Sequence, residues 1–410
     1  MKEPKIRFKG FSGEWKMPKL GDVFEIRNGY TPSKAVSAFW TNGTIPWFRM
    51  EDIRDKGGLL KEAYQKVTRE AVKGGGLFEA NSILLATTAT IGVHAMLIAD
   101  SLANQQFTNL KIRKSLVANY TPMYIYYSFF GIDEWCIKNS NAGGLLSVNM
   151  TELCKLPFLT PSLSEQRTLS SYFTSLDAQI SASTSRLASL KQMKAASLQA
   201  MFPQEGETVP KVRFKEFKGE WKKVKLNTFA KRIMRKNSNL ESTLALTIAS
   251  AYGLVSQAEY FNNLVVGSNI QNYYLLKKGE FAYNKSYSNG YPFGTVKRLD
   301  RYEQGILSTL YIVFSIDNSV SSDYITHFFD TTLWHKEIAE RAEEGARNHG
   351  LLNIATRDFF DIYIWMPDSV KEQQSIASFF TSLDRQITLH TQRLEKLKQI
   401  KAACLDKMFV

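Results

Sequence analysis

Side chains of the kinds that bind nucleic acids gather in two polar stretches, the first of which lies between residues 27 and 106. Lysine and arginine neutralise phosphates, whereas asparagine, glutamine, arginine and hydroxyl groups can also read the edges of bases. The amides of Asn104, Gln105 and Gln106 belong to this stretch. Its candidate contact residues are Asn28, Tyr30, Thr31, Ser33, Lys34, Arg49, Thr87, Thr88 and Thr90.

The second polar stretch lies between residues 231 and 349 and joins a basic run to a loop rich in amides, hydroxyls and tyrosines. Such a mixture can hold a phosphate backbone and read bases together. The candidates in this half are Arg235, Lys236, Asn284, Lys285, Ser286, Tyr287, Asn289, Tyr291, Arg347, Asn348 and His349. The alternative for each of them is an ordinary polar surface loop.

Motifs for catalysis are missing from the sequence. The glycines at 74–76 lack the lysine and hydroxyl of a phosphate-binding loop, and no Gly-x-Gly-x-x-Gly turn or Asn-Pro-Pro-Tyr motif occurs. None of the five histidines pairs with a cysteine at zinc spacing. Pro367-Asp368 resembles part of a nuclease motif but has no Glu-x-Lys after it, so Asp368 is better explained as part of a helix start. We therefore expect no catalytic residue, no metal ligand and no cofactor bound by this chain.

Charge and composition favour a polyanionic partner. The 410 residues include 52 lysines and arginines against 39 aspartates and glutamates, which gives a net charge of +13. Nucleic acid is the leading candidate for the partner, and a device for solubility is the alternative. No run of 18 apolar residues predicts a membrane span, and the polar, basic start lacks the apolar core of a signal peptide. With only three scattered cysteines, the sequence predicts a reducing, cytoplasmic location.

Two long amphipathic helices must position these loops. Residues 165–202 and 372–409 align with a shift of 207 (372 − 165 = 207) and are identical at 22 of 38 positions. A capping box at Ser162 and Glu165 predicts a start near Leu163, and Pro203 predicts the end. Apolar residues recur at helical spacing, which predicts a coiled-coil seam. They are Leu169, Phe173, Leu176, Ile180, Leu187, Leu190 and Leu198 in the first helix, and Phe380, Leu383, Ile387, Leu394, Leu397 and Leu405 in the second.

The whole chain is an internal duplication. Pro4 to Lys9 and the Gly-Glu-Trp-Lys at 13–16 return as Pro210 to Lys215 and 219–222, a shift of 206. We predict an α+β fold in which two sheet-rich domains are separated by two long helices that bury their apolar stripes against each other as a coiled coil. The alternative is that each helix packs separately on its own domain. The predicted parts are a first domain at 1–160, a central helix at 161–203, a second domain at 204–366 and a distal helix at 367–410.

Within the globular parts, apolar runs bounded by turn residues predict strands at 82–86 and 93–98, and at 244–248, 279–283 and 309–314. Residues 120–137 and 322–342 are predicted to be helical. The repeated ends and helices stay alike, whereas residues 21–140 and 227–343 have diverged. Two tasks of the same kind with different targets would produce this pattern.

Taken together, these features resemble the specificity (S) subunits of type I restriction-modification enzymes over essentially the full length. The resemblance rests on two variable units alternating with two near-identical helices that open with Glu-Gln at 165–166 and 372–373, and on Trp15-Lys16 and Trp221-Lys222. It also rests on Asn284 to Ser288 and Gly345 to Gly350.

The resemblance implies several properties that the residues alone do not establish. Each globular unit would be a target recognition domain for one half of a split, asymmetric DNA site. The helices would pack as an antiparallel coiled coil, which would turn the sequence repeat into a pseudo-twofold axis in space. They would set the gap between the half-sites and dock two methyltransferase (M) subunits, and two restriction (R) subunits would join for cleavage. S-adenosylmethionine would bind to M, and ATP and Mg²⁺ to R.

Two other classes of function compete with this interpretation. A stand-alone DNA methyltransferase or nuclease is opposed by the missing motifs. A coiled-coil adaptor with no role on DNA is opposed by the charge and the divergent polar loops. A DNA-binding coiled-coil adaptor without a methyltransferase partner is the alternative that stays open. A helix of 38 residues would be about 57 Å long at ~1.5 Å per residue, enough to separate two DNA-binding modules by a helical turn of about 34–36 Å or more.

Overall fold

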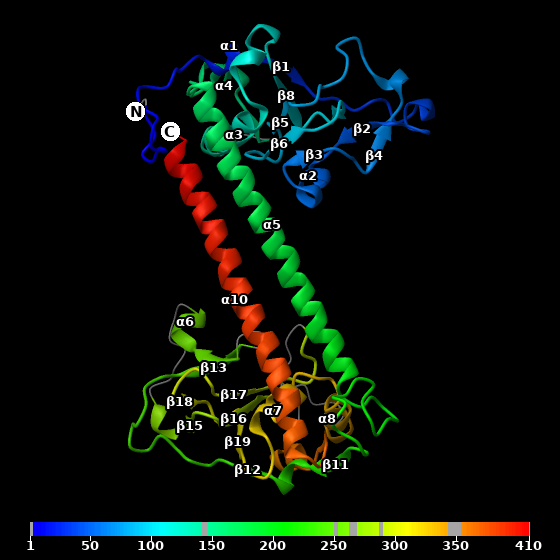
Figure 1. The fold of residues 1–410 in the computed structure, drawn as a ribbon, viewed down its shortest axis with the longest axis vertical. Coiled ribbons are helices and arrows are strands. Elements are labelled where there is room, and N and C mark those ends of the chain that lie inside the picture. Colours follow the sequence, from blue (N-terminus) through cyan, green and yellow to red (C-terminus); the bar gives the residue numbers. More distant parts are fainter. Residues whose placement is uncertain are drawn as a thin grey trace. The chain divides into compact units, whose positions relative to one another are not determined.

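The computed structural model divides the chain into two compact units (Figure 1). Unit 1 comprises Met1–Ser185 and Gln392–Val410, and unit 2 comprises Arg186–Thr391. The structure describes residues 3–141, 146–249, 253–261, 269–286, 290–342, 352 and 354–409. Both long helices are shared between the units, so each unit holds half of each helix. The four-part division expected from the sequence gave each helix a part of its own, and it remains a prediction.

Unit 1 is built on a sheet with the strand order β1-β8-β5-β6-β3. Its strands are β1 (Phe24–Asn28), β8 (Phe107–Ile112), β5 (Ile83–Ala86), β6 (His94–Leu97) and β3 (Leu59–Leu60). The four larger strands pair antiparallel, and β3 joins β6 in parallel. Every residue of β5 and β6 is buried, which explains why their sequences are short apolar runs without alternation. A second sheet has the order β4-β2-β7, from β2 (Ile45–Phe48), β4 (Gln65–Val67) and β7 (Leu102–Ala103).

Helix α3 (Pro122–Lys138) covers part of this framework with an aromatic face. Phe24 of β1 packs edge-to-face against Phe129 of α3 and against Phe158, with ring centroids 5.6 and 5.1 Å apart. Leu169 and Phe173 of the first long helix belong to the same core. The remaining short elements of unit 1 are α1 (Leu20–Val23), η1 (Ser37–Phe39), α2 (Met50–Lys56), η2 (Arg69–Ala71), η3 (Lys114–Asn119), β9 (Ser140–Asn141), β10 (Ser147–Val148) and α4 (Met150–Lys155).

Unit 2 has a central sheet with the order β12-β19-β16-β17, and all its neighbours are antiparallel. Its strands are β12 (Ala230–Arg232), β19 (Ile312–Ile316), β16 (Phe281–Asn284) and β17 (Thr295–Arg298). Three strand pairs surround it: β11 (Lys222–Lys225) with β20 (Tyr363–Met366), β13 (Leu246–Ala249) with β14 (Gly253–Ser256), and β15 (Tyr274–Lys277) with β18 (Gln304–Leu307). The other elements are η4 (Leu226–Thr228), α6 (Gln257–Phe261), η5 (Ile270–Asn272), α7 (Ser322–Phe328), α8 (His335–Arg341) and α9 (Thr356–Phe360).

The two central sheets therefore repeat one topology, although their sequences have diverged. The order β1-β8-β5-β6 in unit 1 corresponds strand for strand to β12-β19-β16-β17 in unit 2. Ile83 of β5 pairs with Leu110 of β8, as Phe281 of β16 pairs with Phe314 of β19. This register gives equivalent positions in the two units without any sequence match between them.

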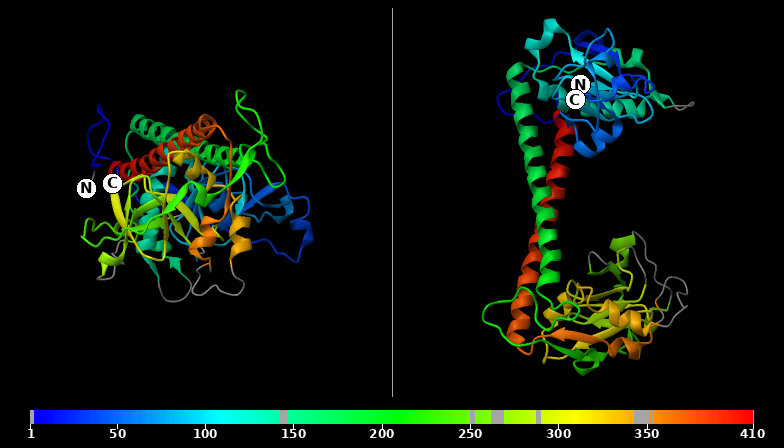
Figure 2. Two further views of the ribbon diagram at one scale, coloured as in Figure 1. Left: turned by 90° about the horizontal axis from the view of Figure 1, so that it is seen from below. Right: turned by 90° about the vertical axis from the view of Figure 1, so that its right-hand side faces the viewer.

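The long helices are α5 (Leu163–Ala200) and α10 (Val370–Met408), so the predicted start at Leu163 and end before Pro203 are confirmed. Within each unit, one half of α5 lies beside one half of α10 (Figure 2). In unit 1, Tyr172 contacts Cys404 and Asp177 contacts Lys401, so higher numbers on α5 meet lower numbers on α10. The helix segments in this unit therefore run antiparallel, as predicted.

Most predicted strands lie within two or three residues of their observed places, and α3 confirms the helix expected at 120–137. The single helix expected at 322–342 is wrong, because the chain forms α7 and α8 with a break between them. At the break the Thr331 hydroxyl donates to the Phe328 carbonyl, and the Trp334 indole donates to the carbonyl of Phe329. These bonds take carbonyls that a continuous helix would use. In the described parts of the chain, no helix is both long and apolar enough to cross a membrane.

Candidate nucleic-acid interface

The two best candidate loops lie at the same place in the two units. Residues 87–90 follow β5 and lead to β6, whereas Asn284 to Tyr291 belong to the connection from β16 to β17. Because β5 corresponds to β16 and β6 to β17, both loops leave the same corner of the duplicated sheet. The sequence predicted each loop by itself, and the topology shows that they are equivalent.

In unit 1, the ends of β1 and β5 meet the start of β8 at one edge of the sheet. Asn28 pairs across the sheet with Thr108, which in turn pairs with Leu85. The Thr108 hydroxyl lies 3.1 Å from Asn28 Oδ1 and 2.8 Å from the Thr87 hydroxyl. Thr87 is buried, so its hydroxyl supports this edge and is not presented to solvent. Asn28 is exposed and remains accessible.

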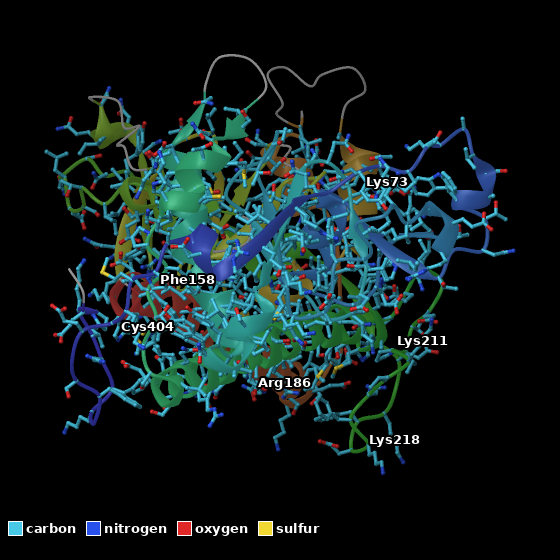
Figure 3. The ribbon with its side chains drawn as sticks, turned by 90° about the horizontal axis from the view of Figure 1, so that it is seen from above. Lys73, Phe158, Arg186, Lys211, Lys218 and Cys404 are labelled. Carbon is cyan, nitrogen blue, oxygen red and sulfur yellow. The ribbon has the colours of Figure 1, made fainter. Side chains whose placement is uncertain are left out.

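Tyr30 and Thr31 continue this edge from the end of β1. The Tyr30 hydroxyl donates to the Ala71 carbonyl at 3.1 Å and accepts from the Lys73 amide at 2.9 Å. The Lys73 ammonium lies 4.6 Å from the centre of the Tyr30 ring, and Figure 3 marks this lysine. Thr31 donates to Gln105 Oε1 at 2.6 Å. The structure thus adds Lys73 and Gln105 to the edge.

Only one of these two residues carries a signal in the sequence. Gln105 belongs to the amide-rich stretch at 104–106, whereas Lys73 is not among the candidates from the sequence. Among the other candidates of unit 1, Ser33 and Lys34 are exposed, and Thr88 and Thr90 are half-buried.

Arg49 follows β2 and lies over the Trp47 ring, 5.8 Å from its centre. Its guanidinium pairs with Glu51, and its Nε is buried without a hydrogen-bond partner. The residue before Arg49 is held close to the amide-rich stretch at 104–106, because the backbone amide of Asn104 donates to the carbonyl of Phe48 at 3.0 Å. An arginine that stacks on an aromatic ring keeps donors in a fixed plane, which suits it to bind a phosphate or a base edge.

In unit 2, the candidate loop is pinned at both ends. Asn284 Oδ1 accepts from the Ser286 amide at 3.0 Å, and the Lys285 carbonyl accepts from the Leu352 amide at 3.0 Å. Gly294 has a φ of +79°, and an added Cβ there would lie 2.1 Å from the Asn284 carbonyl oxygen. The start and end of the loop are therefore held in close contact. Lys285, Ser286 and Tyr291 are half-buried.

Five candidates of unit 2 lie outside the described residues: Tyr287, Asn289, Arg347, Asn348 and His349. Arg235 and Lys236 are described, but the structure does not bring them to the end of β16. The Arg235 guanidinium lies 2.6 Å from Glu280, just before the start of that strand. The Lys236 ammonium donates to the Asn272 carbonyl at 2.9 Å and lies 4.0 Å from the centre of the Tyr274 ring. These two cations are engaged elsewhere on the unit.

The apolar residues of the helix stripe divide into two groups. Most are buried and several belong to the globular cores, so the stripe is both a helix–helix seam and an anchor for each unit. Buried members are Leu169, Phe173, Leu176, Leu187, Leu190, Phe380, Leu383 and Leu394. Half-buried members are Ile180, Leu198, Ile387, Leu397 and Leu405. The alternative of helices packed only on their own domains is wrong for unit 1, since Tyr172 of α5 contacts Cys404 of α10 there.

The start of each long helix carries an arginine–glutamate anchor, where the sequence predicts only a capping box at Ser162 and Glu165 of the first helix. The Ser162 hydroxyl accepts from the Glu165 amide, as expected, but the Glu165 carboxylate turns to Arg7. Arg7 holds it through Nε and a terminal nitrogen at 2.7 and 2.8 Å. Arg213 holds Glu372 in the same way, at 2.7 and 2.9 Å. These bidentate pairs link the repeated amino-terminal segment of each half to the helix of that half.

The same arginines also donate hydrogen bonds to backbone carbonyls a few residues later in their own repeated segments. Arg7 donates to the carbonyl of Gly13, and Arg213 donates to the carbonyls of Gly219 and Lys218. Lys211 and Lys218 extend from the second of these segments (Figure 3). The sequence repeat was visible beforehand, but its partner on the helix was not.

The buried glutamines beside these glutamates fasten the helices to the globular parts. Gln166 accepts from the Thr121 amide at 3.0 Å, directly before α3. Gln373 accepts from the Ser321 amide at 2.9 Å, directly before α7. Both side-chain amides also donate to the carbonyl of the proline that precedes their helix, Pro161 or Pro367. The Glu-Gln pair at each helix start is therefore structural.

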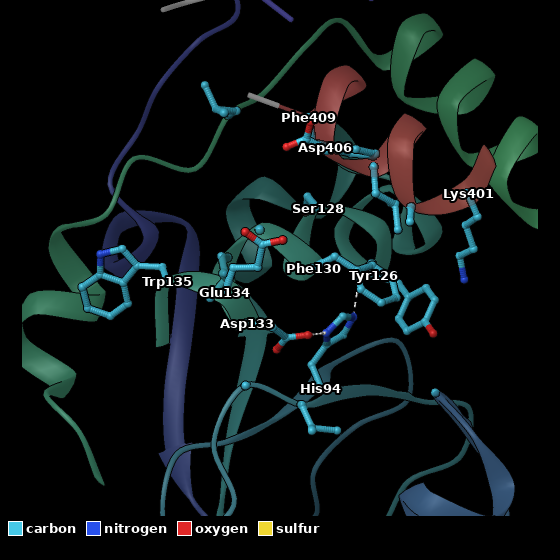
Figure 4. A pocket seen from close by; sticks show the side chains of 18 of the residues that line it. His94, Tyr126, Ser128, Phe130, Asp133, Glu134, Trp135, Lys401, Asp406 and Phe409 are labelled. Atoms are coloured by element: carbon cyan, nitrogen blue, oxygen red, sulfur yellow. Dashed lines mark hydrogen bonds and ion pairs between the residues drawn. The ribbon is translucent and has the colours of Figure 1, made fainter. Parts of the chain in front are cut away.

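A pocket of about 1160 Å³ lies in unit 1 between α3, the end of α10 and the start of β6 (Figure 4). At its wall, His94 Nδ1 lies 2.5 Å from Asp133 Oδ2, and His94 Nε2 lies 2.9 Å from the Tyr126 carbonyl. Both ring nitrogens of His94 therefore face oxygen atoms, one of a carboxyl group and one of a backbone carbonyl. Burial raises the pKa of Asp133, although His94 acts in the opposite direction. The pair joins β6 to α3 and makes no contact with the candidate loops.

Comparisons with known proteins agree with this geometry. The family described as "Type I restriction modification DNA specificity domain" matches residues 12–192 and 218–399. The specificity subunit of the Escherichia coli type I restriction enzyme EcoprrI is 47% identical over 152 residues, which is 37% of each chain. The MjaIX specificity subunit of Methanocaldococcus jannaschii is 27% identical over 169 residues, 40% of this chain and 38% of that one. The chain thus matches less than half the length of these relatives.

Two solved structures share the fold at low sequence identity. The S subunit of a type I restriction-modification system from M. genitalium superposes with a TM-score of 0.60 at 13% identity, and the match covers 100% of this chain and 99% of that one. A chain from a study of the assembly and conformational transition of the type I restriction-modification system gives 0.53 at 13% identity, with 96% of this chain and 97% of that one covered. The two family matches fall on the two halves of the duplication and cover most of the sequence. The chain belongs to the type I restriction modification DNA specificity family and carries two copies of its domain.

Proposed function

We propose that this protein is the sequence-specific DNA-binding subunit of a type I restriction-modification complex. Each unit reads one half of a bipartite, asymmetric site in double-stranded DNA, and the chain itself catalyses nothing. The observation that carries the proposal is the shared corner of the two sheets. One topology presents hydroxyls and amides in unit 1, and a loop that contains an amide, a lysine and a hydroxyl in unit 2.

A repeated frame with different side chains at the same corner suits two different half-sites. Direct readout depends on which donors and acceptors reach the base edges, whereas the frame fixes their position on the duplex. The net charge of +13 supplies the sequence-independent attraction to phosphates. In unit 1 the candidates whose side chains are exposed to solvent are Asn28, Ser33 and Lys34.

The partners and cofactors follow from the family and belong to the same proposal. The paired helices set the gap between the half-sites and dock two methyltransferase subunits, and two restriction subunits complete the cleaving complex in the cytoplasm. S-adenosylmethionine binds to the methyltransferase subunits, and ATP and Mg²⁺ to the restriction subunits. The two repeated anchors, Arg7 with Glu165 and Arg213 with Glu372, support docking of two copies of one partner, because they present the helix starts identically.

The test is selection of bound DNA from a duplex library that is randomised over a bipartite site. The protein is purified with the partners that it retains from its host, and the bound molecules are sequenced at moderate salt. We expect two short specified blocks separated by an unspecified gap, with affinity that falls steeply as salt rises. Selection without any preferred sequence would contradict the proposal, as would methylation of DNA by the purified chain alone with S-adenosylmethionine.

A further inference from the structure

Unit 2 contains a buried charge network that connects its candidate loop to the long helices. Side chains from α5, β17, α7, the segment after α7, and α10 meet at one point. They are Lys194, Lys297, His327, Asp330 and Asp384. Apart from Asp384, whose side chain is 40% exposed, none exceeds 20% exposure. Charges held this far from water must be paired.

Asp330 is the centre of the network. Its Oδ1 accepts from the Lys297 ammonium at 2.7 Å, and its Oδ2 accepts from the Lys194 ammonium at 2.9 Å. Lys194 also bonds to Asp384 of α10 at 2.8 Å. Burial by itself would raise the pKa of Asp330, but His327, Lys297 and Lys194 together lower it well below its usual range. The carboxylate therefore stays charged and bridges two lysines.

His327, Asp330 and Asp384 also have the ligand types of a divalent-cation site. His327 Nδ1 is buried without a hydrogen-bond partner and lies 3.9 Å from Asp330 and 3.8 Å from Asp384. The Lys194 ammonium, however, already lies between the two carboxylates. A metal ion would have to share this space with a buried positive charge, so the lysines are the cations of this cluster.

The network is joined to the candidate loop through β17. Lys297 lies on this strand, which begins where the loop ends, and the Tyr283 hydroxyl donates to the Phe293 carbonyl at 2.8 Å. A small pocket of about 340 Å³ is lined by Gly290 and Tyr291 of the loop and also by Lys194, Lys297 and Asp330. The loop and the network therefore share one wall.

The equivalent place in unit 1 keeps only part of this arrangement. Asp177 and Lys401 stand at the positions of Asp384 and Lys194 in the duplication (384 − 177 = 207; 401 − 194 = 207), and their charged atoms lie 2.6 Å apart. Tyr127 donates to Asp177 at 2.9 Å, where unit 2 has His327 facing Asp384.

In unit 1, the positions that match Asp330 and Lys297 carry no charged side chain that could link the Asp177–Lys401 pair to the sheet. Three residues after Tyr127 the chain has Phe130, and the Lys401 ammonium lies 5.2 Å from the centre of its ring. Ala95 pairs with Leu84 on β5, as Lys297 pairs with Ala282 on β16. The positions of Asp330 and Lys297 are thus apolar in unit 1.

We propose that Lys194, Asp330 and Lys297 are positioning residues for DNA recognition by unit 2, and that unit 1 has no such connection between its long helices and its loop. Lys297 fixes the strand that leaves the loop, Asp330 joins that strand to α5, and Lys194 joins both to α10. This inference rests on the proposed function. It assigns these three residues to the orientation of the loop and gives them no contact with DNA.

The experiment compares matched lysines in the two units. Lys297→Met, Lys194→Met and Lys401→Met are each purified with the retained partners and tested by the library selection described above. For Lys297→Met and Lys194→Met we expect discrimination to fall about tenfold, the scale of one mismatched base pair, at the block read by unit 2 only. Lys401→Met should leave the discrimination at both blocks unchanged. Lys297→Arg should restore discrimination, because it keeps the charge that Asp330 needs.

Thermal unfolding of each variant separates loss of position from loss of the fold, and Lys194→Met tests the network from a helix if Lys297→Met does not fold. The inference is overturned if both variants of unit 2 keep the wild-type discrimination, or if they lose affinity equally for all sequences. It is also overturned if Lys401→Met relaxes the block read by unit 1 to the same extent. A wild-type protein that selects no sequence would instead refute the proposed function, so the two failures are distinguishable.

Discussion

Unit 1 and unit 2 are nearly identical where they hold the long helices and different where their strands connect. Arg7 and Arg213 bind their glutamates with matching distances, and Tyr124 and Tyr324 each donate to a backbone carbonyl at 2.5 Å. In their described residues, the connections after β5 and β16 differ both in sequence and in the side-chain contacts that they make. The two copies have therefore kept the contacts that attach each unit to the long helices, and they have diverged at the corner of the sheet that we propose to bind DNA.

The comparison also reveals that divergence reached the interior. Unit 1 has the hydrogen-bonded His94–Asp133 pair between β6 and α3, whereas unit 2 has the cluster of four charged side chains around Asp330. Both devices join the strand after the candidate loop to a neighbouring helical segment. Equivalent positions in the fold can therefore be secured by quite different chemistry.

The largest expected effect comes from breaking the repeated anchors. Glu165→Ala or Glu372→Ala leaves an arginine without its buried partner, which typically costs about 3–5 kcal/mol. Because the two geometries match, we expect the two variants to lose similar amounts, measured as the free energy of unfolding in urea. Glu220→Ala, which removes an exposed acidic residue of the second repeated segment, is a control for the loss of a negative charge. If one variant loses more than twice as much unfolding free energy as the other, the two anchors are not equivalent.

The buried carboxylates should give the two units opposite responses to pH. The pKa of Asp133 is raised, so its contribution to stability is present below the unfolded value of about 3.9 and is lost as the pH rises through the raised value. The pKa of Asp330 is lowered, so its contribution is present above about 3.9 and is lost as the pH falls through the lowered value.

Variants that remove these carboxylates test the signs. Relative to the wild type, Asp133→Asn should flatten the decline of unfolding free energy as the pH rises above about 4, and Asp330→Asn should flatten the decline below about 4. Urea unfolding followed across this range measures both. Curves of either variant that run parallel to the wild-type curve would contradict the assigned ionisation.

The smallest expected effect belongs to an ion pair at the surface of unit 2. Lys222 and Asp368 lie 2.7 Å apart, but their side chains are 66% and 67% exposed. Such pairs contribute about 0–1 kcal/mol, so Asp368→Ala should change the unfolding free energy by less than about 1 kcal/mol. The helix cap does not depend on Asp368, since the Ser369 hydroxyl accepts from the Glu372 amide. A loss as large as that of Glu372→Ala would mean that the helix start relies on Asp368 after all.

The duplication, the helix bounds and the coiled-coil seam could be predicted because internal identity, amphipathic periodicity and capping residues are visible in the sequence itself, whereas the antiparallel direction came from the family resemblance. The sequence did not predict that Glu165 meets Arg7, since the two residues are 158 positions apart and the capping box explained Glu165 locally. The separation of Arg235 from Asn284 was equally hidden, because it depends on the register of β12 against β19. Buried Thr87 was taken for a contact residue because a hydroxyl after a strand looks the same whether it faces solvent or a neighbouring threonine.

Exchange of one variable region tests the central claim most directly. Residues 21–140 are replaced by the matching segment of a relative with a different DNA site, the chimaera is purified with its partners, and the bound site is mapped. The account predicts a new sequence in one block only, with the other block and the gap unchanged. A change in both blocks, or in neither, would contradict the conclusion that each unit reads its own half-site.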